Sequence, residues 1–171
     1  MAAFDPATDL SDDLAFRLLS TSPVTLFRRR QALDETVAWL GDHGYQVTHL
    51  DAAQWATEDD LHRDIAVALA FPDYYGRNLD ALNDCMRDVV SQDYGWAPDT
   101  TGLVLVFTRY DFFAARCPRP AQIVLDIMAD HSRGAALIGR RLICLAQSDD
   151  PRIHFEPVGA TPVAGPPPPR S

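Results

Sequence analysis

The sequence predicts an α/β fold in which a small, mainly parallel sheet of three or four strands is flanked by helices in three layers. Short apolar runs alternate along the chain with longer segments whose apolar residues have helical spacing. Two of these runs, 103–108 and 141–146, are apolar almost throughout, which is typical of strands covered on both faces. The chain has 171 residues, 47% of them hydrophobic, and this is enough for one domain with a substantial core.

The first part of the chain predicts a helix, a strand and a second helix. A serine–aspartate pair at 11–12 can cap a short helix over 11–20. The β-branched, apolar run 23–28 predicts a strand. Apolar residues at helical spacing predict a helix over 31–43, which Gly44 ends. We expect this strand to be able to join the sheet as a fourth parallel strand.

The middle of the chain predicts a strand over 45–50 and then a helix over 58–70. Thr57 and Asp60 have the spacing of a capping box, in which each side chain accepts a hydrogen bond from a backbone amide at the start of the helix. Pro72 prevents the helix from continuing. The remaining expected elements are a helix over 78–90, the strand 103–108, a helix over 121–131 and the strand 141–146.

From residue 148 onward the alternating pattern stops. This tail contains seven of the 13 prolines, four of them in a row at 166–169, and we expect it to be extended and largely disordered. A polyproline ligand for an SH3-like partner is an alternative to a simple solvated tail. The chain therefore divides into a helix–strand–helix extension over 1–44, a domain over 45–147 and a proline-rich tail over 148–171.

Composition limits the classes of partner and the compartment. The 24 acidic residues exceed the 15 basic ones, all arginine, so the net charge is −9. Such a surface repels nucleic acid and attracts cationic proteins, so we expect no direct nucleic-acid partner. The chain shows neither a signal peptide nor the run of about 20 apolar residues that a membrane helix needs. Three scattered cysteines suggest neither disulfides nor a zinc site. We expect a cytoplasmic protein without contact to membranes.

The helix expected over 78–90 has two opposite faces. At 100° per residue, an apolar arc faces the core and an acidic stripe lies about opposite to it. The arc consists of Leu79, Leu82, Met86 and Val89, and the stripe of Asp80, Asp84 and Asp88. Like charges at i, i+4 destabilise a helix by a few tenths of a kcal/mol per pair, and only Arg87, which can pair with Asp84, offsets this repulsion.

The acidic stripe has two interpretations. Asp80 can complement the helix dipole while the other two aspartates are ordinary surface. The preceding loop favours a binding surface instead, because Tyr74, Tyr75, Gly76 and Asn78 place aromatic area and a glycine beside charge. Gly76 also allows close backbone approach or a positive φ.

Residues 72–85, PDYYGRNLDALNDC, resemble the signature loop and helix of the barstar family, and the order of elements is similar over residues 45–147. The resemblance implies a barstar-like fold and an intracellular inhibitor that binds, 1:1, to the basic active site of a secreted microbial ribonuclease. It implies neither a cofactor nor a metal. The partner-binding residues expected from stripe, loop and resemblance together are Tyr74, Tyr75, Gly76, Asn78, Asp80, Asn83, Asp84, Arg87, Asp88 and Asp130.

The resemblance also implies roles for individual residues. Asp84 is the central carboxylate that reaches the arginine and histidine cluster of the nuclease, and Asp80 pairs with another arginine of the cleft. Tyr74 stacks on or covers the catalytic histidine, while Gly76 and Asn78 contact the rim of the cleft. Carboxylates suit this purpose because arginine-rich anion sites bind them through charge-assisted hydrogen bonds.

The chain departs from the family pattern in its aromatic residues. Asn83 stands where family members often have tryptophan, and Val89 stands near the position of a second one. Tyr94 and Trp96 either supply aromatic surface from a shifted position or belong to the core. Asp130 matches a late acidic residue of the family only if one residue is skipped.

Two other functions compete with inhibition of a ribonuclease. An enzyme could use Asp80 and Asp84 as metal ligands, but the sequence contains no second acidic motif and no phosphate-binding or hydrolase motif, so we expect no enzyme. The chain could instead be a barstar-like immunity or regulatory protein with a different nuclease, toxin or non-nuclease partner. The residues alone leave this alternative open.

Overall fold

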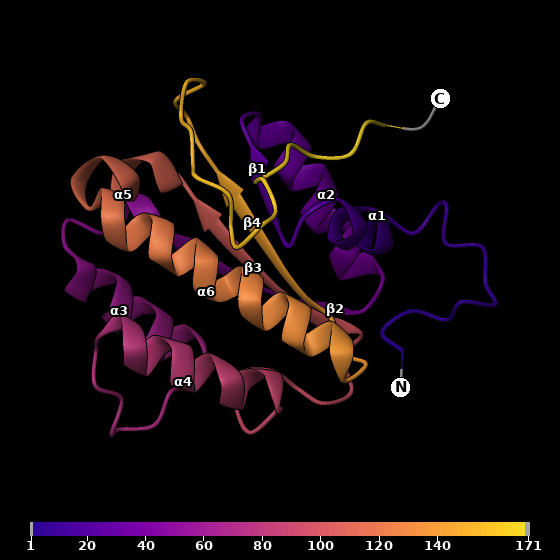
Figure 1. Ribbon diagram of the computed structural model, residues 1–171, viewed down its shortest axis with the longest axis horizontal. Coiled ribbons are helices and arrows are strands. Elements are labelled where there is room, and N and C mark those ends of the chain that lie inside the picture. Colours follow the sequence, from indigo (N-terminus) through magenta and orange to yellow (C-terminus); the bar gives the residue numbers. More distant parts are fainter. Residues whose placement is uncertain (1, 170–171) are drawn as a thin grey trace.

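Four parallel strands form the middle layer of the molecule, in the order β1-β4-β3-β2. They are β1 (Val24–Phe27), β2 (Tyr45–Asp51), β3 (Gly102–Thr108) and β4 (Leu142–Gln147). The structure, a computed structural model, describes residues 2–169, and helices cover both faces of its sheet (Figure 1). The predicted α/β class and the mainly parallel sheet are confirmed.

The inner strand β3 is buried along its whole length because both of its faces pack against helices. Leu103 and Leu105 belong to the larger apolar cluster on one face of the sheet. Val104 and Val106 point the other way and pack in a second cluster with α1 and α2. This two-sided burial explains why residues 103–108 are almost uninterruptedly apolar.

The N-terminal extension adds β1 to one edge of the sheet and two helices to one face. The helices are α1 (Leu14–Thr21) and α2 (Arg30–Asp42). Strand β1 pairs in parallel with β4, so the predicted fourth strand is confirmed. Helix α1 begins later than predicted, because the Asp13 carboxylate accepts the Phe16 amide at 3.1 Å and caps it.

The opposite face is covered by α3 (Glu58–Ala68), α4 (Leu79–Val90), α5 (Tyr110–Arg116) and α6 (Pro118–Leu137) (Figure 1). A short 3₁₀ helix, η1 (Ala52–Gln54), follows β2. Helix α5 was not predicted; it is one short segment whose Tyr110 and Phe113 are fully buried. Helix α6 begins before the predicted residue 121, because Pro118 is tolerated in a first turn.

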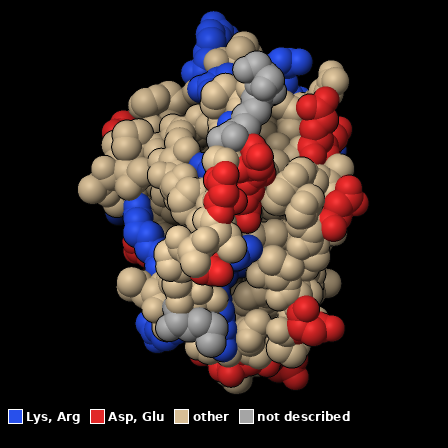
Figure 2. Space-filling model, turned by 90° about the vertical axis from the view of Figure 1, so that its right-hand side faces the viewer, with Lys and Arg blue, Asp and Glu red and all other residues tan. Residues whose placement is uncertain are grey.

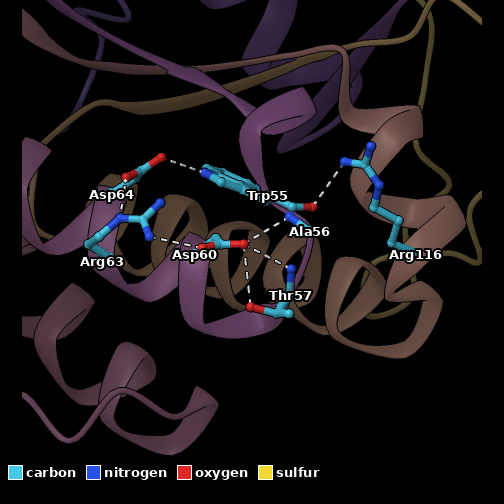
Figure 3. Close-up of polar contacts among 7 residues, drawn as sticks. All are labelled: Trp55, Ala56, Thr57, Asp60, Arg63, Asp64 and Arg116. Carbon is cyan, nitrogen blue, oxygen red and sulfur yellow. Dashed lines mark hydrogen bonds and ion pairs between the residues drawn. The ribbon is translucent and has the colours of Figure 1, made fainter.

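The start of α3 is fixed to its neighbours by polar contacts (Figure 3). The predicted capping box is present, and Asp60 also accepts the Ala56 amide at 2.9 Å. The Trp55 indole donates to Asp64 at 2.8 Å, and Arg116 of α5 donates to the Trp55 carbonyl at 3.3 Å. These contacts join α3 to Trp55 at the end of η1, and Arg116 joins the same segment to α5, so the helix that precedes the loop is held at its start.

The C-terminal segment follows a course that differs from the expected disordered tail. After β4 the chain turns back along the sheet and passes α1 and α2 (Figure 1). Phe155 and Val158 are buried, and Arg133 of α6 donates to the Val158 carbonyl at 2.7 Å. The many prolines suggest a disordered segment and draw attention away from Phe155 and Val158, which fix it to the domain. Residues 170 and 171 of the tail lie outside the described part, as does residue 1.

The described residues also show whether a helix could span a membrane and whether the cysteines form disulfides. No helix within residues 2–169 has the length and apolar composition to cross a bilayer. Cys85, Cys117 and Cys144 are free thiols. Cys85 and Cys144 are buried, and burial raises the pKa of the Cys144 thiol well above its usual value.

Candidate protein-binding site

Helix α4 separates an apolar face from an acidic one. Leu82, Met86 and Val89 are fully buried, while Leu79 is half-buried. On the other side Asp80 is exposed, and the Asp84 side chain is 70% exposed. The predicted core face of this helix is confirmed, and the first two aspartates of the stripe point to solvent.

The first turn of α4 is held by Asn78. Its side-chain oxygen accepts the Ala81 amide at 2.8 Å and caps the helix. Its amide nitrogen lies 3.4 Å from the Gly76 carbonyl. Asn78 therefore has a structural role. It fixes the first turn of α4 and with it the direction in which the Asp80 side chain points.

The three aspartates of the stripe have different surroundings. Asp84 forms an exposed ion pair with Arg87, at 3.6 Å. Asp80 forms no ion pair with any residue of the described chain, 2–169. Asp88 is half-buried and accepts the Tyr94 hydroxyl at 3.1 Å. Asp80 and Asp84 therefore present more of their charge to solvent than Asp88 does.

The two neighbouring tyrosines of the loop point in different directions. Tyr74 is 78% exposed. Tyr75 is half-buried, its hydroxyl is hydrogen bonded to the buried His62 of α3, and its ring packs edge-on against Phe71. Burial raises the pKa of Tyr75 well above its ordinary value. Tyr74 is therefore the tyrosine available to a partner, and Tyr75 holds the loop to α3.

The backbone of this loop is strained at Arg77 and Ala70, and not at Gly76. Arg77 has φ 51° and Ala70 has φ 54°, both in the left-handed region that side chains disfavour. A Cβ atom added at Gly76 would meet its nearest neighbours at 3.5 Å, which is ordinary contact. Of the two possibilities at Gly76, close backbone approach or a positive φ, the structure excludes the positive φ, and the conformation of the chain itself does not require glycine there.

Helix α6 contributes a histidine that the sequence did not single out. His131 Nε2 lies 2.9 Å from Asn83 Oδ1, which joins α6 to α4. Burial lowers the pKa of His131, and the nearby Arg87 lowers it further. The adjacent Asp130 is exposed and pairs with Arg133 at 3.2 Å. Nothing in the sequence shows that His131 faces Asn83, because the two residues are on different helices.

The aromatic residues after α4 belong mainly to the core. Trp96 is 9% exposed, and its indole donates to the Val89 carbonyl at 2.7 Å. Tyr94 is half-buried and packs edge-on against Phe71. Of the two alternatives for these residues, the structure favours the core, since Trp96 offers little surface to a partner.

Asp80 and Asp84 of α4 are not part of a metal-binding cluster among the described residues. Within residues 2–169 no group of three or more His, Cys, Asp or Glu residues is placed to hold a metal ion. The two solvent-facing carboxylates and the exposed tyrosine lie on a helix and a loop whose other sides pack against the domain.

Comparison with known proteins identifies the family of the chain. The family model described as Barstar (barnase inhibitor) matches residues 45–147, from the start of β2 to the end of β4. The "Putative ribonuclease inhibitor YrdF" of Bacillus subtilis (strain 168) is 35% identical over 81 residues, which are 47% of this chain and 79% of that protein. Residues 1–44 and 148–171 lie outside the family match. The chain belongs to the barstar family.

Proposed function

We propose that the chain inhibits a secreted microbial ribonuclease by covering its basic active site, 1:1, with α4 and the loop 70–78. Membership of the barstar family and the similarity to a protein named as a ribonuclease inhibitor support an inhibitor rather than an enzyme. In this proposal the carboxylates of Asp80 and Asp84 take the place of substrate phosphates.

The exposure of Asp80 and Asp84 on one side of a helix whose other side is buried is the observation on which the proposal rests. The two carboxylates are one helical turn apart, about 6 Å along the helix axis. Because the buried side fixes the helix, little backbone freedom is lost when a partner binds. The net charge of −9 would also accelerate encounter with a cationic protein.

The loop 70–78 supplies the aromatic and backbone contacts of the proposed interface. Tyr74 would place its ring against a residue of the cleft, and Gly76 would let the partner approach the backbone closely. The remaining expected contacts, Asn78, Arg87, Asp88 and Asp130, would lie around this centre. Tyr75 and Asn83 would support the interface by holding the loop and α4 in place, through hydrogen bonds to His62 and His131.

A different partner is the alternative proposal. Asn83 is held by His131 and presents no aromatic ring between the two carboxylates. An immunity or regulatory protein that binds another nuclease, a toxin or a non-nuclease partner would use the same surface. Asn83 would then lie at the centre of that surface in place of an aromatic residue. We propose the cytoplasm as the place of action in either case, which the three free cysteines support.

Titration of purified chain into a panel of secreted bacterial ribonucleases tests the proposal. We expect at least one enzyme to be inhibited stoichiometrically, with an affinity that falls as salt rises from 50 to about 300 mM because the interaction is between opposite charges. Asp84→Asn should weaken inhibition about 30-fold or more, the range of an interface hot spot.

Asp34→Asn is the matched control for this experiment. Asp34 lies on α2, its side chain is 64% exposed, and it pairs with Arg30 at 3.2 Å, so the variant changes the same net charge at a distant exposed ion pair. Inhibition by Asp34→Asn should equal that of the unchanged chain within about threefold. Equal losses in both variants would show a general charge effect and contradict a site on α4.

The same preparation distinguishes the alternatives. If excess protein inhibits no enzyme of the panel, a pull-down from the native secretome and lysate looks for a different partner. Such a partner should bind the unchanged chain at low salt, dissociate at high salt, and bind the Asp84→Asn variant less. Metal-dependent turnover of a nucleic acid by the chain alone would contradict the assignment as an inhibitor.

A further inference from the structure

Strand β1 is an edge strand, and the C-terminal segment 162–169 runs along its open side. The Leu26 amide donates to the Ala164 carbonyl at 2.8 Å, and Ala164 also forms a parallel bridge with the neighbouring residue of β1. The Ser22 hydroxyl donates to the Pro162 carbonyl at 3.1 Å. Addition of an extended segment to an exposed edge is a general way in which sheets bind peptides.

Beyond the strand edge, the prolines at 166–169 pass over a groove between α1, β1 and α2. The Arg17 guanidinium donates to the Pro168 carbonyl. Leu14, Ala32 and the half-buried Trp39 line the same groove. Prolines have no amide hydrogen, so their rings and carbonyl oxygens are what a binding surface can contact, and apolar walls with an arginine donor suit both.

The tail does not fill the groove. An open pocket of about 480 Å³ remains between the prolines and the body of the domain. Figure 2 views the molecule from the side of α1, α2 and the two chain ends, and most of the surface there is uncharged. Arg28 and Arg29 lie beside the pocket together with Arg17, and Arg28 donates to the Pro151 and Ile153 carbonyls. Arginine side chains therefore hold carbonyl oxygens of the tail at two places, Pro168 and the turn 151–153.

We propose that the surface of β1, α1 and α2 is a docking site for an extended, proline-rich segment, and that residues 162–169 are its resident ligand. The main-chain hydrogen bond from Leu26 to Ala164 and the Ser22 side chain position the upstream half of the segment, and the groove takes the prolines. This surface is on the opposite face of the sheet from α4 (Figure 1). A segment from another molecule can therefore displace the tail while the acidic surface remains open.

Removal of the resident segment tests the proposal. A variant that ends at Thr161 is titrated with a labelled, acetylated peptide of residues 162–169, PVAGPPPP, and binding is followed by fluorescence polarisation. We expect 1:1 binding to the variant and at least about tenfold weaker binding to the full chain, because a tethered tail competes at an effective concentration near millimolar. The peptide PVAGAAAA, which lacks the prolines that contact the groove, should bind at least about tenfold less tightly.

Two further substitutions locate the peptide. In the shortened chain, Arg17→Ala should weaken the peptide at least about tenfold. Arg119→Ala, at an exposed position of α6, is the matched control and should change nothing. A shortened chain that is folded by circular dichroism and does not bind PVAGPPPP would overturn the proposal, as would equal binding of the alanine peptide.

Hydrogen exchange in the full chain provides a test that does not need truncation. In the full-length Arg17→Ala variant the Leu26 amide should exchange at least about tenfold faster than in the unchanged chain, because its acceptor Ala164 belongs to the released segment. The Val104 amide in β3 should be unaffected. Unchanged exchange at Leu26 would show that the arginine does not hold the segment and would contradict the proposed docking.

Discussion

The guanidinium of Arg87 lies 3.6 Å from the carboxylate of Asp84 on the exposed face of α4. Both side chains are about two-thirds exposed, at 67% and 70%, so the pair is in contact with water and contributes little to folding. It nevertheless places a positive charge beside the carboxylate that is central to the proposed interface. Arg87 therefore reduces the attraction of this surface for a cationic nuclease.

We predict that Arg87→Gln tightens binding to the ribonuclease found in the inhibition panel by up to about fivefold, or about 1 kcal/mol, at low salt. The association rate should rise with it, and the gain should shrink at high salt. Stopped-flow association at two ionic strengths measures both. Weaker binding would place Arg87 among the residues that donate to the partner.

The two faces of α4 predict opposite effects of two neighbouring substitutions. Leu82→Ala should lower the free energy of unfolding by about 2–5 kcal/mol, because it removes a fully buried side chain and leaves a cavity. Asp84→Ala should change it by no more than about 0.5 kcal/mol. Urea denaturation of both variants measures the difference. A larger loss in Asp84→Ala would reverse the assignment of the faces.

Gly76→Ala separates the needs of folding from those of binding. The added methyl group has room and φ at this residue is not positive, so stability should stay equal or rise by up to about 1 kcal/mol. Affinity for the ribonuclease should fall at least about tenfold, since the methyl group stands where the partner approaches the backbone. Thermal melting and inhibition titration on the same sample test this. Unchanged inhibition would mean that the partner does not approach this part of the loop.

Much of the fold could be predicted because it depends on local patterns. The apolar run at 103–108 indicated a strand with two covered faces, and the spacing of Thr57 and Asp60 indicated a cap; both follow from neighbouring residues. Helix α5 escaped prediction because its seven residues, Tyr110–Arg116, are too few to show a clear helical period. The course of the tail depends on contacts far away in sequence, such as Leu26 with Ala164, which no local pattern shows.

The candidate site was predictable as a surface and less so in its details. Helical spacing alone separates Leu82 from Asp84. The orientation of Tyr75 depends on His62, which is 13 residues earlier on a different helix, and two adjacent tyrosines give no indication of which one turns inward. The same limit applies to Asn83, since its partner His131 is 48 residues away.

The burial of His131 has a consequence for pH dependence. His131 is half-buried between α6 and α4, and its pKa is lowered from 6.5, first by burial and also by Arg87. Below about pH 6.5 the unfolded chain therefore binds a proton at this residue before the folded chain does. Its contribution is fully present above that pH, and it decreases as the pH falls toward the lowered pKa of the folded state.

We predict that His131→Gln flattens the pH dependence of stability between about pH 5 and 7. The glutamine amide can still donate toward Asn83 but does not titrate, so the slope due to this residue, at most about 1.4 kcal/mol per pH unit, should disappear. Urea denaturation at several pH values measures it. His154→Gln, at an exposed position, should keep the dependence of the unchanged chain. If His131→Gln also kept it, protonation of His131 would not be coupled to folding.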